Sequence, residues 1–244
     1  MNKLSVLADH SDGSGNSIEC SRAIETGIAV TFRGRNNRII VADGARIAKL
    51  QAVFDCDNGT LVIGPSNKSP FSMNVRVGQD STVRTGADFT TTSVAVVSAV
   101  EGAAVMFGDD VMIASSTQFR TDDGHPIFDV ATGRRVNPAR DVVIGNHVWF
   151  GAQAVALGGA RVGDGSVIGF RSIVTGTIPN NVIAVGSPAR VVRRDVAWER
   201  PHLSFTSPPY KPDAASVAKS EEYWNLTAED VPIFEELSGW HDHH

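Results

Sequence analysis

One histidine in a polar stretch of the chain is the first candidate for chemistry. His125 precedes Pro126 in the sequence DDGHPIFD. An imidazole has an ordinary pKa of about 6.5, which suits a general base near neutral pH. Asp122, Asp123 and Asp129 are close enough in sequence for one of them to orient the ring, and the sequence does not decide which. The alternative is a turn histidine in a polar loop with no catalytic role.

Two further features could bind a substrate. Trp149 ends a six-residue block at a position that should point outward, and its indole N–H can donate a hydrogen bond. The alternative for Trp149 is a surface aromatic residue that packs on the tail. Arg190, Arg193 and Arg194 follow a Gly-Ser-Pro turn, and guanidinium groups bind phosphates well. The alternative for these three is a solvated basic end of the fold.

The histidines do not form a metal-ligand pattern. A zinc site needs several histidines or cysteines that converge. The chain has only Cys20 and Cys56, and its polar end 241–244 (HDHH) is typical of a frayed terminus. The other histidines are scattered: His10, His125, His147 and His202. We therefore expect no metal.

Composition bounds the remaining function classes. The 244 residues carry a net charge of −5 without a long basic block, which argues against a nucleic-acid or anionic-membrane partner. Nothing in the chain approaches a membrane span or a signal peptide, so the expected compartment is the cytoplasm. The chain contains 23 Gly and only 7% aromatic residues, which fits a narrow solenoid core.

The elements that must position these residues are predicted by a six-residue repeat over 144–179. It reads IGNHVW, FGAQAV, ALGGAR, VGDGSV, IGFRSI, VTGTIP, with an apolar first position and mostly Gly at the second. No α-helix has a period of six, whereas six residues contain three strand alternations. Glycine suits a sharp corner between short strands. Hexapeptide repeats of this kind predict a parallel β-helix with coils of about 18 residues.

The repeat extends upstream with one long interruption. The in-phase positions from 77 onward are Val77, Val83, Phe89, Ala95, Phe107, Ile113 and Phe119. Glu101 breaks this series and is expected at an exposed corner, because an unpaired buried carboxylate is costly. The register stops at Phe119 and restarts at Ile144, so the segment of about 120–142 should leave the coil as a loop. Exposed loops on rigid scaffolds often carry the chemistry.

The two ends of the chain are less regular. Residues 18–64 are predicted to form the first coils of the same β-helix, with insertions. We expect the β-helix domain to span 1–194 and a tail or cap to span 195–244. The tail is Pro-rich at its start, and its segments 213–224 and 227–237 could each form a short helix. This tail is interpreted as a cap or a subunit contact.

Taken together, these motifs resemble hexapeptide-repeat acyltransferases over roughly 77–194. They are the hexapeptide blocks, the loop HP, IGNHVWFG, VTGTIP and VGSPARVV. The segment GHPIFDVATGRRVNPARDVVIGNHVWFG is more narrowly similar to bacterial capsule O-acetyltransferases that act on sialic-acid-containing polysaccharides. The resemblance implies an all-β, left-handed parallel β-helix and a homotrimer. It also implies that acetyl-CoA lies along the groove between adjacent β-helices.

The resemblance also implies which residues form the site. His125 would be the catalytic base, and Trp149 would line the active site. The implied acetyl-CoA contacts are Ala152, Phe170, Thr175, Gly176 and Arg190. The family often has Lys where this chain has Gly176, so a charge for the coenzyme phosphates is missing or is supplied elsewhere. Its substitutes could be Arg171, Arg193 or Arg194.

The predicted function is transfer of an acetyl group from acetyl-CoA to a sugar hydroxyl of a capsular or other cell-surface polysaccharide. His125 would take the hydroxyl proton, and backbone N–H groups near Trp149, or its indole, would stabilise the oxyanion. One alternative is the same reaction on a small acceptor such as a nucleotide sugar, an amino sugar or an antibiotic. Another is a non-catalytic β-solenoid that binds or scaffolds, against which the HP in an extruded loop argues.

Overall fold

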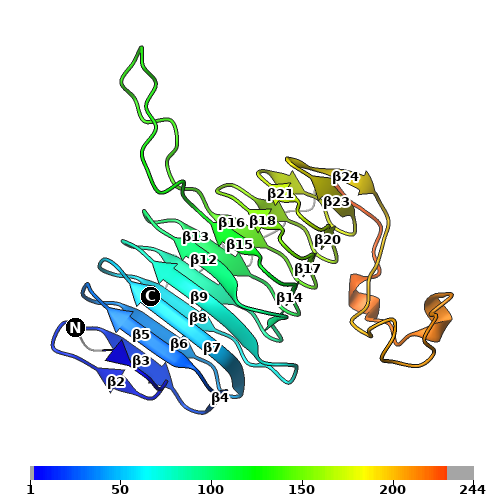
Figure 1. Ribbon diagram of the computed structural model, residues 1–244, viewed down its shortest axis with the longest axis horizontal. Coiled ribbons are helices and arrows are strands. Elements are labelled where there is room, and N and C mark those ends of the chain that lie inside the picture. The colour runs from blue at the N-terminus through cyan, green and yellow to red at the C-terminus, as the bar shows by residue number, and fades with distance from the viewer. Residues whose placement is uncertain (1–2, 230–244) are drawn as a thin grey trace.

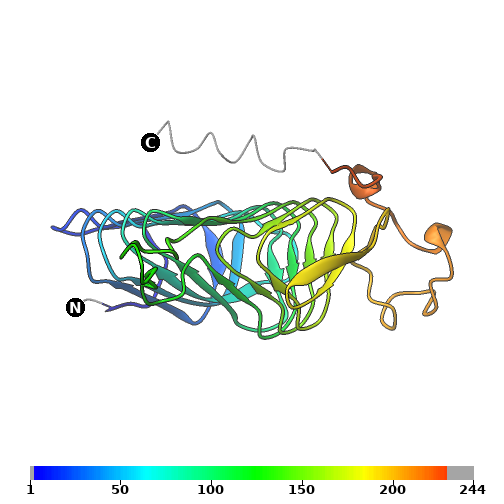
Figure 2. The same ribbon diagram turned by 90° about the horizontal axis from the view of Figure 1, so that it is seen from above.

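Short parallel strands stack into a three-sided solenoid in the computed structural model, which describes residues 3–229 (Figure 1). The fold is a left-handed parallel β-helix, as predicted. Figure 2 shows the coils following one another along the long axis. The named strands pair in parallel except at the ends, where β1 pairs with β5, β2 with β3 and β23 with β24 in antiparallel fashion.

Three sheets, named A, B and C, form the sides. Sheet A contains β1 (Lys3–Leu4), β5 (Ile28–Phe32), β7 (Ala45–Phe54), β9 (Phe71–Val77), β12 (Ala95–Ala99), β15 (Gln118–Arg120), β18 (Val155–Ala156) and β21 (Ile173–Val174), with β4 (Ala23–Glu25) beside β7. Sheet B contains β2 (His10–Ser11), β3 (Ser17–Cys20), β6 (Arg38–Val41), β8 (Thr60–Ile63), β10 (Thr82–Thr85), β13 (Ala104–Phe107), β16 (Val142–Ile144), β19 (Arg161–Val162) and β22 (Thr177–Ile178). Sheet C contains β11 (Thr90–Thr91), β14 (Met112–Ile113), β17 (Trp149–Phe150), β20 (Val167–Ile168), β23 (Ile183–Gly186) and β24 (Ala189–Arg193).

Coil length changes along the solenoid. Val83 pairs with Val105 one coil later, a spacing of 22 residues. Ile144 pairs with Val162, a spacing of 18 residues. The extra residues in each N-terminal coil explain why the six-residue register is blurred there. Phe107 pairs with Ile144, a spacing of 37 residues, because this coil carries the predicted loop.

The inward positions of the repeat form a continuous apolar core. All the in-phase residues from Val77 to Phe119 are buried, as predicted. A ladder of aromatic rings runs through the core with centroids 4.7–5.5 Å apart, and its members are Phe71, Phe89, Phe107, Phe119 and Phe150. Glu101 is exposed at a corner with a φ of 58°, as expected for the residue that breaks the register. The core is therefore rigid enough to fix the positions of its corners.

The loop and the tail leave this regular body. The chain departs after β15, projects away as the green arm in Figure 1, and returns at β16. The tail follows β24 and contains two single-turn 3₁₀ helices, Ala214–Ser216 and Glu221–Tyr223. The segment 213–224, which was expected to form a short helix, contains these two single turns, and neither buries an apolar residue that could anchor a longer helix. The expected helix over 227–237 extends beyond the described residues, and the HDHH end lies outside them.

Across residues 3–229, no helix has the length and apolar character needed to cross a membrane.

Candidate active site

The three corners of the solenoid carry the candidate residues. The A–B corner joins sheet A to sheet B, and the loop leaves the body there. The B–C corner precedes sheet C and the C–A corner follows it. From β11 onward, each coil contributes one turn to each corner, so residues in successive coils lie above one another.

The Asn137 side chain forms hydrogen bonds to other residues of the loop. Its Oδ1 accepts a hydrogen bond from the Ile127 N–H at 2.7 Å. Its Nδ2 donates to the His125 carbonyl oxygen and to Asp123 Oδ2, both at 2.9 Å. At the base of the loop, Arg135 forms an ion pair with Glu101 at 2.9 Å, and this hydrogen bond lowers the pKa of the Glu101 carboxyl. These contacts fix the backbone on both sides of His125.

The His125 side chain is exposed, and no hydrogen bond to its ring is present among residues 3–229. The three neighbouring aspartates are occupied elsewhere. Asp122 accepts from the Gly124 N–H at 2.8 Å, and Asp123 accepts from Asn137. Asp129 accepts from Thr132, whose hydrogen bonds lower the pKa of the Asp129 carboxyl. Within one chain, these three aspartates therefore do not orient the His125 ring.

A pocket of about 390 Å³ lies at the base of the loop. Its walls come from both ends of the loop and from the two following turns of the A–B corner. Asn137 and Arg140 lie on the loop side, and Leu157 and Thr175 lie on the coil side. Arg140 is fixed by donating to the Gly158 carbonyl oxygen at 2.8 Å. The predicted residue Thr175 thus lies beside the loop.

Two other predicted residues lie at the C–A corner. Ala152 and Phe170 occupy successive turns there, joined by a hydrogen bond from the Arg171 N–H to the Ala152 carbonyl oxygen at 3.0 Å. Phe170 is 62% exposed, and the Arg171 guanidinium lies 5.4 Å from its ring centre. The β23–β24 hairpin follows as the next turn, where Arg190 pairs with Val185. Ala152, Phe170 and Arg190 therefore follow one ridge of the solenoid.

Gly176 lies in open space at the A–B corner, next to Thr175. A Cβ built at this position would meet no atom within 4 Å. A lysine would therefore fit, and its replacement by glycine is not forced by packing. Of the possible substitutes for that charge, Arg194 is paired with Glu229, and Arg171 donates to Gln153 at 2.6 Å.

Trp149 lies on sheet C, away from the loop. Its side chain points outward as predicted and is 37% exposed. The indole of Trp198 in the tail lies 5.9 Å away, so the tail covers part of it. His125 projects from the A–B corner, whereas Trp149 belongs to the opposite side of the coil. One chain by itself does not bring the two predicted catalytic residues together.

His147 has a structural role that the sequence did not reveal. It is buried at the B–C corner, where Nδ1 lies 2.6 Å from Asp110 Oδ2 and Nε2 lies 2.9 Å from the Trp198 carbonyl oxygen. Its ring is stacked between Trp198 and Tyr223, with centroids 4.1 and 4.6 Å away. Asp110 also accepts from Arg200 Nε at 2.5 Å. These contacts form a clamp that fastens the tail to the solenoid.

The clamp perturbs the acid–base properties of its members. Burial opposes the ionised form of Asp110, but hydrogen bonds and charge from His147 and Arg200 outweigh it and hold the pKa of Asp110 below its usual value. Burial also raises the pKa of Tyr223. Within residues 3–229, no group of three or more His, Cys, Asp or Glu side chains is placed to hold a metal ion.

Comparison with known proteins identifies the family of this chain. Residues 141–176 match the family described as "Bacterial transferase hexapeptide (six repeats)". The crystal structure of the polySia-specific acetyltransferase NeuO superposes with a TM-score of 0.71 at 33% identity, covering 78% of this chain and 81% of that one. The chain belongs to the hexapeptide-repeat acetyltransferases. The polysialic acid O-acetyltransferase OatWY has the same fold, with a TM-score of 0.68 at 23% identity over 79% of this chain and 92% of that one.

Curated members of the hexapeptide-repeat acetyltransferases align over shorter stretches. The polysialic acid O-acetyltransferase of Escherichia coli O1:K1 / APEC is 35% identical over 96 residues, which are 39% of this chain and 31% of that protein. The galactoside O-acetyltransferase of Escherichia coli (strain K12) is 40% identical over 94 residues, which are 38% of this chain and 46% of that protein. This chain thus spans about a third to a half of the length of these two relatives.

Proposed function

We propose that this hexapeptide-repeat protein transfers an acetyl group from acetyl-CoA to a sugar hydroxyl of a cell-surface polysaccharide. The observation that carries the proposal is the loop that interrupts the coil. It holds the backbone around His125 through Asn137 and leaves the imidazole exposed to a reactant. The names of the relatives, which include polysialic acid and galactoside O-acetyltransferases, support the reaction class and a sugar acceptor.

The proposed mechanism is direct transfer. His125 takes the proton of the acceptor hydroxyl while the oxygen attacks the thioester carbonyl carbon. The resulting oxyanion is stabilised by N–H donors near Trp149 or by its indole. The intermediate collapses, the C–S bond breaks, and the imidazolium returns the proton to the leaving thiolate. Along the C–A ridge, Ala152, Phe170 and Arg190 would contact the donor, and Thr175 and Gly176 would do so at the A–B corner of an adjacent subunit.

The active form of the protein is proposed to be a homotrimer. His125 and Trp149 lie on different sides of one chain, so a complete site requires the loop of one subunit to reach sheet C of another. The loop also exposes apolar side chains that a neighbour would cover, and these are Ile127, Phe128, Val130 and Val136. Closed cyclic assemblies use such head-to-tail contacts.

The decisive experiment compares His125→Ala with His202→Ala, an exposed tail histidine that serves as the matched control. We expect His125→Ala to lower kcat by about 10²- to 10⁴-fold, as for loss of a general base, with unchanged acetyl-CoA binding. His202→Ala should leave kcat unchanged. Mass spectrometry of acceptors, from acidic polysaccharide to a small galactoside, identifies the product. Near-normal turnover in His125→Ala would overturn the assignment.

A mixing experiment tests the shared site. Trimers that contain both His125→Ala and Trp149→Ala chains should recover activity at one of their three interfaces, where each chain supplies its intact residue, which is about one quarter of all interfaces in an equimolar mixture. Trimers of either variant alone should remain impaired. No recovery in verified mixed trimers would place both residues in one chain's site.

A further inference from the structure

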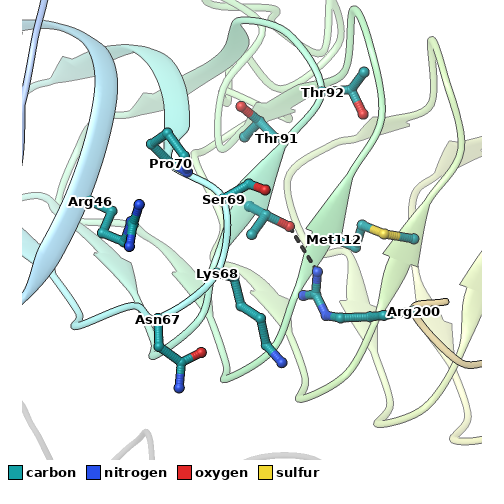
Figure 3. A pocket seen from close by; sticks show the side chains of 10 residues that line it. Arg46, Asn67, Lys68, Ser69, Pro70, Thr91, Thr92, Met112 and Arg200 are labelled. Carbon is teal, nitrogen blue, oxygen red and sulfur yellow. Dashed lines mark hydrogen bonds between the residues drawn. The ribbon is translucent and has the colours of Figure 1, made fainter. Parts of the chain in front are cut away.

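A basic groove of about 740 Å³ opens beside sheet C (Figure 3). Sheet C begins only at β11, and in the coil before it residues 64–70 run on this side as a loop, beside Arg46 of β7. At this edge of β11, the Thr91 hydroxyl accepts from the Ser72 N–H at 2.8 Å, which joins β11 to β9. The groove is lined by Arg46, Lys68, Ser69, Thr90, Met112 and Arg200, among others. It is separate from the loop that carries His125.

The groove carries positive charge that no acidic residue of its lining neutralises. Its lining contains no Asp or Glu. The Nε atom of Arg46 is buried without a hydrogen-bond partner among residues 3–229. The Lys68 ammonium likewise has no ion pair with any described residue. Buried donors are normally satisfied, so Arg46 Nε is an exception, and the exposed Lys68 adds a second positive charge to the groove of a chain with a net charge of −5. Together they point to an anionic ligand.

Arg200 forms part of the groove wall. It donates to Thr90 Oγ1 at 3.0 Å, the contact drawn in Figure 3, and to Asp110 in the clamp. This guanidinium is therefore fixed in place, and its charge is partly offset by Asp110. Arg46 and Lys68 supply the charge that remains available to a ligand.

The groove leads toward the candidate active site. In sheet C, Thr90 pairs with Met112, and Met112 pairs with Trp149. Adjacent strands lie about 4.8 Å apart, so Trp149 lies about 10 Å along the sheet from the Thr90 end of the groove. An extended acceptor with one unit at Trp149 would place its next units over Met112 and in the groove.

We propose that this groove binds carboxylate groups of an acidic glycan acceptor, at units next to the one that is acetylated. Arg46 and Lys68 form charge-assisted hydrogen bonds to the carboxylates, and the Ser69 and Thr92 hydroxyls are placed to contact the sugar. The inference deepens the proposed function and rests on it for the role of the ligand as acceptor. Binding itself can be measured without any turnover.

The test is calorimetric titration of the full chain without acetyl-CoA. The probes are a sialic acid oligosaccharide, the same oligosaccharide with its carboxylates reduced to alcohols, and inorganic phosphate. The double variant R46Q/K68Q removes both charges and retains polar side chains. The control R22Q/K49Q removes two positive charges elsewhere, since Arg22 lies in an exposed ion pair with Asp43 and Lys49 lies on sheet A. R46K/K68R preserves the charges, and circular dichroism verifies the fold of each variant.

We expect the acidic oligosaccharide to bind the wild type and R22Q/K49Q equally, with binding that weakens as salt rises. R46Q/K68Q should bind it about tenfold more weakly, as for loss of charged hydrogen bonds, and R46K/K68R should retain most of the affinity. Equal binding of the reduced oligosaccharide, equal binding by R46Q/K68Q, or binding of phosphate alone would overturn the proposal.

Kinetics separate this inference from the proposed function. With acidic acceptor, R46Q/K68Q should raise KM by a similar factor, while kcat toward a neutral galactoside stays unchanged. If the wild type binds the acidic oligosaccharide through the groove but acetylates no sugar, the proposed function fails and the binding site remains. If it acetylates sugars but the variants bind alike, only the groove assignment fails.

Discussion

Asp110 gives the most quantitative test of how the tail is held. Its carboxylate lies 2.6 Å from the His147 ring and 2.5 Å from the Arg200 guanidinium. The His147 side chain is almost completely buried, and the side chains of Asp110 and Arg200 are only 22% and 19% exposed. Asp110→Asn keeps the shape but removes the charge that both partners face.

The size of the effect follows from this burial. Removing one partner of a fully buried ion pair costs about 3–5 kcal/mol, and the residual exposure of Asp110 reduces our expectation to about 2–3 kcal/mol. The control is Asp43→Asn, whose pair with Arg22 has side chains 62% and 78% exposed. Exposed pairs contribute about 0–1 kcal/mol, so this control should change little.

Hydrogen exchange of the tail amides measures the opening of the clamp. The Val196 N–H, which donates to the Asn181 carbonyl oxygen at 3.0 Å, is a suitable reporter. A loss of about 2–3 kcal/mol corresponds to exchange about 30- to 150-fold faster. Exchange within about twofold of the wild type, as in the Asp43→Asn control, would refute the view that Asp110 holds the tail.

The same carboxylate predicts an acid dependence. Because the folded-state pKa of Asp110 is lowered, its stabilisation is present above the unfolded value of about 3.9. It is lost as the pH falls through the lower folded-state pKa. The protection of the tail amides, measured relative to their intrinsic exchange rates, should therefore fall in the wild type below about pH 4, whereas Asp110→Asn should lack this component. An identical acid profile for both proteins would contradict this account.

Three further predictions concern the loop and the core. Asn137→Ala should lower kcat by about 10- to 100-fold, because the backbone around His125 loses its anchor, and an unchanged kcat with an unchanged urea midpoint would contradict this role. Phe107→Ala should reduce the free energy of unfolding by about 3–5 kcal/mol, because the ring contacts Phe89 and Phe119 in the core, and urea titration checks this value. Glu101→Gln should speed hydrogen exchange in residues 127–137 without shifting the urea midpoint, because its pair with Arg135 holds only the base of the loop; a shifted midpoint would show a wider structural role.

The repeat predicted the body of the fold because each coil imposes the same requirement on its residues. An inward position must be apolar in every coil, so Val83 and its partner Val105 are both buried, as are Phe107 and its partner Ile144. Glu101 broke the pattern and lies at an exposed corner, because a charge there avoids desolvation. Such constraints are local and repeated, and they can be recognised without knowing the contacts between coils.

The tail contacts could not be predicted in the same way. Asp110 and His147 are 37 residues apart in sequence and become neighbours because the loop lengthens that coil. Their relation to Trp198 depends on how an irregular segment returns to the body, over 51 residues. Nothing periodic connects these positions, so a histidine that clamps the tail is indistinguishable in sequence from one on the surface.

Both proposed binding regions lie where the repeat is interrupted, and there is a physical reason for this. A regular coil satisfies its backbone hydrogen bonds with the coils on either side and buries its apolar positions, so it leaves few groups for a ligand. The loop after β15 exposes the His125 imidazole, and the loop over 64–70 lines the groove together with Arg46, whose Nε has no partner among the described residues. Between the groove and the site, Met112 and Trp149 lie side by side in the sheet. The regular strands thus set the distance between the groove and the site near Trp149. We therefore expect the coil geometry to favour acceptors whose acidic units have a matching spacing.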